Sequence, residues 1–200
     1  MQKIAVFGGT FNPIHNGHIE TAKFFARTLN FNRTVFVPTN IPPHKSAAGI
    51  APAAHRLKMC ALAVDGIEGF EVSGVEIARA GKSYTVDTLN FFKKRYPEAE
   101  MYLIMGADMF LTLQDWKAPE EIFRLATICT VPRDENNYLK LKTHAERLSR
   151  RGLRSVVADT ARIPISSTQI RNSFKNQQDV SSMIPDEVFA YILAHKLYQE

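Results

Sequence analysis

Short apolar runs rich in Val, Ile and Phe alternate along this chain with longer segments of helical spacing. The runs expected to form strands are Lys3–Phe7, Thr34–Pro38, Glu71–Ala78, Met101–Met105, Ala126–Val131 and Ser155–Ala158. Strands of about five residues that are separated by crossover-length helices are typical of βαβ units. Continuous apolar runs indicate parallel strands that are buried on both faces. The pattern therefore predicts an α/β fold with a doubly wound, mainly parallel sheet.

Segments of helical spacing separate these runs. They cover Gly17–Leu29, Pro52–Val64, Thr85–Arg95, a broken stretch over Met109–Arg124, and Tyr138–Arg150, and two further helices, Ser167–Asn176 and Pro185–Tyr198, are expected at the end. Because no repeat or domain-sized linker divides the 200 residues, we expect one domain over residues 1–200, with a helical part from about 167 to 200. Ligands of such sheets bind beyond the carboxyl ends of the strands, so the loops there are expected to carry the function.

Composition and charge narrow the class of protein. A hydrophobic fraction of 45% with 22% charged residues excludes a chain that is disordered throughout. No apolar stretch approaches the roughly 20 residues of a membrane span, and the first residues do not read as a signal peptide. Cys60 and Cys129 each lie inside an apolar run, which indicates reduced thiols in a cytoplasmic protein. The net charge of +5 favours anionic partners without distinguishing nucleotides from nucleic acids or membranes.

The loop after the first expected strand has the features of a phosphate site. It reads Gly8-Gly9-Thr10-Phe11-Asn12-Pro13-Ile14-His15-Asn16-Gly17-His18. Adjacent glycines let backbone N–H groups approach a ligand, and the positive end of the following helix favours anions. His15 and His18, three residues apart, can face one ligand and donate hydrogen bonds to phosphate oxygens. A helix cap or a zinc pair is the alternative, but no nearby Cys or carboxylate cluster completes a zinc site.

A second candidate phosphate site follows the last expected strand. Ser166 with Gln169 three residues later matches a capping box, which predicts a helix N-terminus here. The free N–H groups, the hydroxyls of Ser167 and Thr168, and the forked guanidinium of Arg171 could together hold phosphate oxygens. An ordinary capped helix is the alternative for this segment taken alone.

Residues between the two loops could hold a second substrate. His44 and Lys45 follow Pro42-Pro43 in a long loop and offer positive charge or donors, although a solvent-exposed loop is the alternative. Gly106 permits close approach, and the carboxylate of Asp108 can accept hydrogen bonds from a ribose hydroxyl or an adenine amino group. Trp116 is either a core residue or a platform that stacks on an aromatic ring.

The two loops together resemble the H-x-G-H nucleotidyltransferase superfamily, in which Ser-Ser-Thr-x-Ile-Arg is the partner motif. Three further blocks, Pro-Pro-His-Lys, Ser-Tyr-Thr-Val-Asp-Thr-Leu and Gly-Ala-Asp…Trp, are similar to those of the bacterial nicotinate mononucleotide adenylyltransferase family, and the resemblance runs from Lys3 to Arg171. Two positions depart from the family pattern. Asn12 stands where many members carry Asp, and Asp134-Glu135 follows Arg133 where Pro-Gly is usual.

The resemblance implies a Rossmann-like fold and an activity. The enzyme would transfer AMP from ATP to nicotinate mononucleotide, giving deamido-NAD and pyrophosphate by direct in-line attack without a covalent intermediate. It also implies Mg²⁺ carried by ATP, no metal ligands from the protein and no tightly bound organic cofactor. No membrane or nucleic-acid partner is expected, and a homo-oligomer is left open.

The resemblance also implies roles for individual residues. The catalytic residues would be His15, His18 and Arg171. The residues implied for ATP binding are Gly8, Gly9, Thr10, Phe11, His15, His18, Gly106, Asp108, Arg133, Ser167, Thr168 and Arg171. The residues implied for nicotinate mononucleotide binding are Asn12, His44, Lys45, Arg56, Thr85, Trp116 and Lys117.

Other functions compete with this one at the level of sequence. Pantetheine-phosphate adenylyltransferases and cytidylyltransferases share the superfamily, but their chains are shorter and lack the Ser-Tyr-Thr and Gly-Ala-Asp…Trp blocks in this arrangement. A nucleic-acid-binding protein is the alternative of another class, because basic residues gather at Lys140, Lys142, Arg147, Arg150, Arg151 and Arg154. No interleaved aromatic residues follow them, so a solvated helix face is expected. The sequence leaves open the preference between acid and amide mononucleotides.

Overall fold

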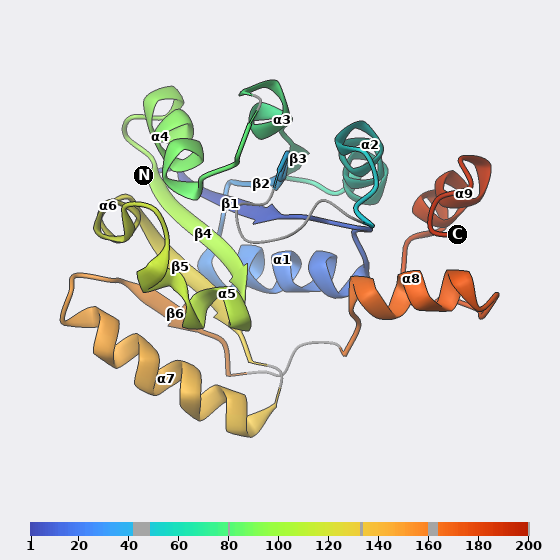
Figure 1. Ribbon diagram of the computed structural model, residues 1–200. Coiled ribbons are helices and arrows are strands. Elements are labelled where there is room, and N and C mark those ends of the chain that lie inside the picture. Colours follow the sequence, from blue (N-terminus) through green and yellow to red (C-terminus); the bar gives the residue numbers. More distant parts are fainter. Residues whose placement is uncertain (42–48, 80, 133, 160–163, 200) are drawn as a thin grey trace.

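The computed structural model describes residues 1–41, 49–79, 81–132, 134–159 and 164–199. The strands in these residues are β1 (Lys3–Gly9), β2 (Arg33–Pro38), β3 (Phe70–Val72), β4 (Glu100–Gly106), β5 (Ala126–Val131) and β6 (Ser155–Val157). They form a six-stranded parallel sheet of order β3-β2-β1-β4-β5-β6 (Figure 1). The predicted doubly wound parallel sheet is therefore confirmed. The strand order reverses between β1 and β4, which is where ligands of such sheets bind.

Helices cover both faces of the sheet. Their bounds are α1 (Asn16–Leu29), α2 (Ala53–Val64), α3 (Val75–Arg79), α4 (Thr85–Arg95), α5 (Ala107–Leu111), the 3₁₀ helix η1 (Leu113–Asp115), α6 (Pro119–Leu125), α7 (Glu135–Ser149), α8 (Ser167–Lys175) and α9 (Asp186–Ala194). α5, η1 and α6 correspond to the stretch that was predicted to be broken. Within the described residues, none of these helices combines the length and the apolarity that crossing a membrane requires.

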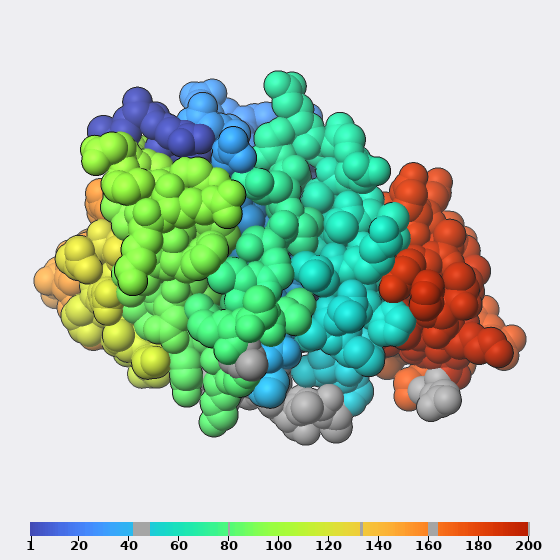
Figure 2. Space-filling model, turned by 90° about the horizontal axis from the view of Figure 1, so that it is seen from above, coloured from blue at the N-terminus to red at the C-terminus, as the bar shows by residue number. Residues whose placement is uncertain are grey.

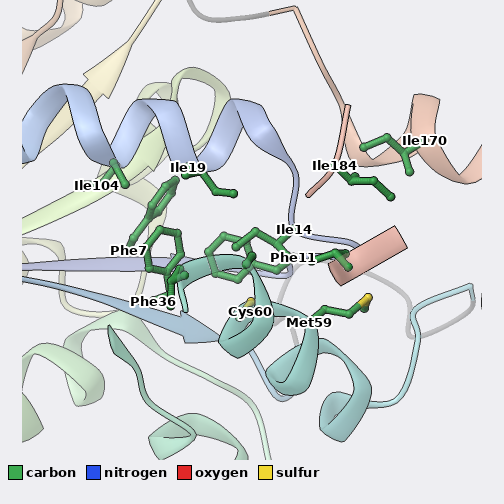
Figure 3. Close-up of a cluster of buried hydrophobic side chains, with 14 of the residues drawn as sticks. Phe7, Phe11, Ile14, Ile19, Phe36, Met59, Cys60, Ile104, Ile170 and Ile184 are labelled. Atoms are coloured by element: carbon green, nitrogen blue, oxygen red, sulfur yellow. The ribbon is translucent and has the colours of Figure 1, made fainter. Parts of the chain in front are cut away.

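Side chains of β1 alternate between two hydrophobic clusters. Ala5 and Phe7 pack with α1, α2, α8 and α9, whereas Ile4 and Val6 pack with α4, α5, α6 and α7. Figure 3 shows the ring of Phe7 beside that of Phe36 between α1 and α2. Because both faces of β1 are buried, its run of apolar residues is continuous, as the sequence pattern predicts.

The expected strand over Glu71–Ala78 is wrong in its second half. β3 ends at Val72, and α3 begins at Val75. The hydroxyl of Ser73 accepts a hydrogen bond from the backbone N–H of Val75 at 3.4 Å, which favours a helical turn at this point. The β-branched residues of this run favour a strand locally, but the chain turns at Ser73 and Gly74 into α3, which places Glu76 in a buried position.

The last helix also departs from expectation, because α9 ends at Ala194 and not at Tyr198. Lys196 adopts a left-handed conformation with φ 50°, and the N–H of Leu197 donates to the carbonyl of Ile192 at 3.0 Å. This is the hydrogen bond of a Schellman motif, which ends a helix and turns the chain. The last residues therefore fold back, and Figure 2 shows the C-terminal segment in red against the cyan surface that includes α2.

The start of α7 differs as well. The helix begins at Glu135 and not at Tyr138, because the side chain of Asp134 accepts a hydrogen bond from the N–H of Asn137 at 2.8 Å. An aspartate in this role is a strong helix start signal.

Candidate active site

Two cavities open where the carboxyl ends of β1 and β4 lie side by side. The larger has a volume of about 270 Å³ and the smaller about 230 Å³. Both are lined by Gly8, Gly9, Met105, Gly106 and Met109, so they adjoin along this wall. A Cβ atom added to Gly8 or Gly106 would meet no atom within 4 Å, which leaves the backbone open to a ligand.

The larger cavity gathers three residues implied for mononucleotide binding, which are Thr85, Trp116 and Lys117. Thr10, implied for ATP binding, lines this cavity too. α4 begins at Thr85, and the positive end of this helix favours an anionic group. The ammonium of Lys117 lies 4.3 Å from the centre of the Tyr84 ring, which adds positive charge beside an aromatic surface.

Sequence reasoning did not assign several polar lining residues of the larger cavity, among them Glu76, Ser83 and Tyr84. Ser83 and Tyr84 directly precede Thr85, so the Ser-Tyr-Thr block already pointed at them. No local signal could have found Glu76, because its run was expected to be a strand.

Glu76 is a buried acid in the cavity wall. The hydroxyl of Thr88 donates to its Oε1 at 2.6 Å, and Arg79 donates to the hydroxyl oxygen of Thr88 at 3.2 Å. Burial raises the pKa of the Glu76 carboxyl, while hydrogen bonds from Thr88 and Ser83 oppose that rise. Through this hydrogen bond Glu76 joins α3 to α4 in the wall of the larger cavity.

The smaller cavity contains both histidines of the first loop. The rings of His15 and His18 stack with their centroids 3.6 Å apart. The backbone N–H of His15 donates to Nδ1 of His18 at 3.3 Å. When Nδ1 accepts a hydrogen bond, the neutral ring carries its proton on Nε2. His18 can therefore donate a hydrogen bond from Nε2. Asp108, implied for ATP binding, also lines this cavity.

Phe11 supports the loop from within the core. Its backbone is left-handed, with φ 47°, a conformation that is uncommon for a residue with a side chain. Its ring packs edge-on against Phe7 and His18, at centroid distances of 5.5 and 5.1 Å. A Cβ atom on Gly9 would lie 2.9 Å from this ring, so a glycine is required beneath it. Although Phe11 lines the smaller cavity, most of its surface is used for packing.

α8 brings the second motif against the first loop. The side chain of Ser166 accepts a hydrogen bond from the N–H of Gln169, which confirms the predicted helix cap. The hydroxyl of Ser167 donates to the carbonyl of Pro13 at 2.9 Å. Arg171 donates from Nη1 to the carbonyl of Asn12 at 2.9 Å and from Nη2 to the hydroxyl of Thr168 at 3.3 Å.

Asn12 and Arg56, both implied for mononucleotide binding, lie inside the protein and not on the lining of either cavity. Arg56 is only 1% exposed, and its guanidinium donates to the carbonyls of Thr10, Asn40 and Ala51. Burial lowers the pKa of Arg56. In this conformation both residues hold loops together.

Three implied residues, His44, Lys45 and Arg133, lie outside the described residues. Among the described residues, no group of three or more His, Cys, Asp or Glu side chains could hold a metal ion.

Comparison with known proteins gives concordant matches. The cytidylyltransferase-like family model matches residues 6–173. A probable nicotinate-nucleotide adenylyltransferase of Bacillus licheniformis is 35% identical over 199 residues, which cover 100% of both chains. A probable nicotinate-nucleotide adenylyltransferase of Clostridium novyi is 34% identical over 200 residues, again covering 100% of both.

A solved structure has the same fold. It is the Plasmodium falciparum nicotinic acid mononucleotide adenylyltransferase complexed with NaAD, with a TM-score of 0.81 at 18% identity over 99% of this chain and 98% of that chain. The same protein complexed with APC gives a TM-score of 0.79 at 17% identity, with the same coverage.

Proposed function

Because the chain belongs to the nicotinate-nucleotide adenylyltransferases of the cytidylyltransferase-like family, we propose that it transfers AMP from ATP to nicotinate mononucleotide. The products are deamido-NAD, a precursor in NAD biosynthesis, and pyrophosphate. The observation that carries this proposal is the pair of adjoining cavities at the switch point of the sheet. Each cavity takes one substrate, and the reacting phosphates meet along the shared wall of Gly8, Gly9 and Gly106.

Nicotinate mononucleotide occupies the larger cavity in this proposal. Its pyridine ring stacks on Trp116, and the start of α4 at Thr85 faces its carboxylate. Lys117 adds positive charge on the same side. An aromatic surface beside a helix N-terminus suits a ring that bears an anionic group. His44 and Lys45 are proposed to approach the phosphate of the same substrate.

ATP occupies the smaller cavity and extends toward α8. Its nucleoside lies near Asp108 and Gly106, with Arg133 bordering it. His18 donates from Nε2 to the α-phosphate, and His15 lies nearer the β- and γ-phosphates. Ser167, Thr168 and Arg171 hold the departing pyrophosphate, since Arg can form two parallel bonds with phosphate oxygens.

The chemistry is a direct displacement at phosphorus. A phosphate oxygen of the mononucleotide forms a bond to the α-phosphorus of ATP, and the bond from that phosphorus to the bridging oxygen of the pyrophosphate breaks. A phosphate monoester is mostly ionised at neutral pH, since its second pKa is near 6, so no strong general base is needed. Catalysis therefore depends on positioning and on neutralising charge on the transferred group.

Mg²⁺ is proposed to enter with ATP. When bound, the cation would neutralise charge on the phosphate groups of ATP.

The direct test supplies the purified protein with α-labelled ATP, Mg²⁺ and nicotinate mononucleotide. We expect deamido-NAD and pyrophosphate to form in equal amounts, with no label on the protein. Pyrophosphate release without dinucleotide would contradict the proposal, and so would a labelled adenylyl-protein that forms and decays during turnover. Omission of the mononucleotide is the control, and it should abolish pyrophosphate release.

A further inference from the structure

The end of the chain reaches the first loop of the active site. After the Schellman turn that ends α9, the hydroxyl of Tyr198 donates to Oδ1 of Asn12 at 2.8 Å. These two residues are 186 positions apart in the sequence. Burial raises the pKa of the Tyr198 hydroxyl, so it stays protonated and acts as a donor.

Asn12 also forms hydrogen bonds with two other segments, residues 49–51 and α8. Its Oδ1 also accepts a hydrogen bond from the backbone N–H of Ala51 at 3.0 Å, and its Nδ2 donates to the carbonyl of Gly49 at 3.0 Å. Its own carbonyl accepts from Arg171. Asn12 is 5% exposed, so these bonds form away from water, where losing one is costly.

A continuous set of bonds leads from Ala51 to the wall of the larger cavity. The carbonyl of Ala51 accepts from Arg56, which also holds the carbonyls of Thr10 and Asn40. The N–H of Asn40 donates to the hydroxyl of Ser83 at 3.0 Å. Thr10 and Ser83 both line the larger cavity. The orientation of Asn12 is therefore coupled to the cavity that takes the mononucleotide.

We propose that Tyr198 is a positioning residue, which acts from the C-terminal turn through Asn12 to hold the larger cavity in its binding shape. The expected effect of Tyr198 on substrate binding rests on the proposed function, whereas its effect on Asn12 and Ala51 does not. Tyr198 lines neither cavity, so we expect its effect on the binding of the mononucleotide and not on the chemical step.

The test compares two variants that each lose one hydroxyl. Tyr198→Phe removes the donor to Asn12. Tyr191→Phe is the matched control. The Tyr191 hydroxyl on α9 contacts Nδ1 of His55 on α2 at 2.9 Å, and this contact does not involve Asn12. For Y198F we expect the KM for nicotinate mononucleotide to rise about fivefold, the equivalent of one lost hydrogen bond. The KM for ATP and kcat should stay within about twofold, and Y191F should match the unmodified protein.

A second measurement needs no catalysis. Amide hydrogen exchange at Ala51 should be faster in Y198F than in Y191F at equal melting temperatures, because the acceptor of this N–H is no longer held. If the unmodified protein is inactive, the proposed function fails while the exchange result still decides the structural part. Unchanged exchange at Ala51, or equal rises of both KM values in Y198F, would overturn the role of Tyr198.

Discussion

The backbone N–H of His15 donates to Nδ1 of His18, and the two imidazole rings stack 3.6 Å apart. The protein thereby selects the His18 tautomer that donates from Nε2. This hydrogen bond fixes the His18 ring to the turn that begins α1, so the turn presents a donor where the phosphates of ATP are proposed to lie.

His18→Ala should lower kcat by about 10²–10³-fold, the loss typical of removing one donor to a developing oxyanion. The fold should persist, because the change leaves the hydrophobic cluster behind the loop in place. Steady-state kinetics with circular dichroism checks this. His195→Ala, an exposed histidine that lines neither cavity, is the control. A folded H18A variant with unchanged kcat would remove His18 from the mechanism.

Alanine at two neighbouring glycines should have opposite effects. Gly9→Ala places a methyl group 2.9 Å from the buried ring of Phe11, and such overpacking costs about 1–3 kcal/mol of unfolding free energy. Gly8→Ala meets no protein atom, so its stability should not change, but the methyl group should enter the space of the ligand and reduce kcat/KM. Thermal unfolding and kinetics of both variants give the comparison. An active, stable G9A or a fully active G8A would contradict the loop geometry.

Arg56→Met should destabilise the protein and not simply weaken substrate binding. The substitution leaves three partly buried carbonyls, those of Thr10, Asn40 and Ala51, without their donor. Because hydrogen bonds to charged groups contribute about 1.5–3 kcal/mol, we expect a loss of about 3 kcal/mol or more in urea denaturation. Lys58→Ala, an exposed position on the same helix, is the control and should change little. A fully stable R56M would contradict this structural role of Arg56.

Glu76 should make stability depend on pH. Burial raises the pKa of its carboxyl in the folded state, so its contribution is fully present below the ordinary pKa of Glu and is lost as pH rises through the folded pKa. Relative to Glu76→Gln, the native protein should be most stable below the ordinary pKa of Glu and should lose that advantage as the pH rises above it. Urea denaturation across this range measures the difference. A slope of the opposite sign for E76Q would contradict the assignment.

The sequence pattern within short segments correctly predicted the elements that depend on neighbouring residues. Continuous apolar runs gave the parallel strands, and Ser166 with Gln169 gave the start of α8. The failures have a different origin. β-branched residues near Glu76 favoured a strand, but the chain turns into α3 after Ser73. At the other site, a non-glycine residue, Lys196, adopts the left-handed conformation that ends α9.

Long-range contacts explain the rest of the site. Asn12 and Arg56 are polar residues near the candidate loops, and from the sequence both were expected to bind nicotinate mononucleotide. Their partners, including Tyr198 at the far end of the chain, are brought together only by the completed fold. Charge and position along the sequence do not reveal whether a polar side chain faces a ligand or a carbonyl of the protein itself.

The acceptor specificity tests the central claim most directly. Initial rates of pyrophosphate release should be measured from ATP and Mg²⁺ with nicotinate mononucleotide, nicotinamide mononucleotide or phosphopantetheine at matched concentrations. We predict the highest kcat/KM with nicotinate mononucleotide, because the start of α4 and Lys117 are proposed to face the anionic group on its ring. No release is expected with phosphopantetheine. Release with phosphopantetheine alone would contradict the account.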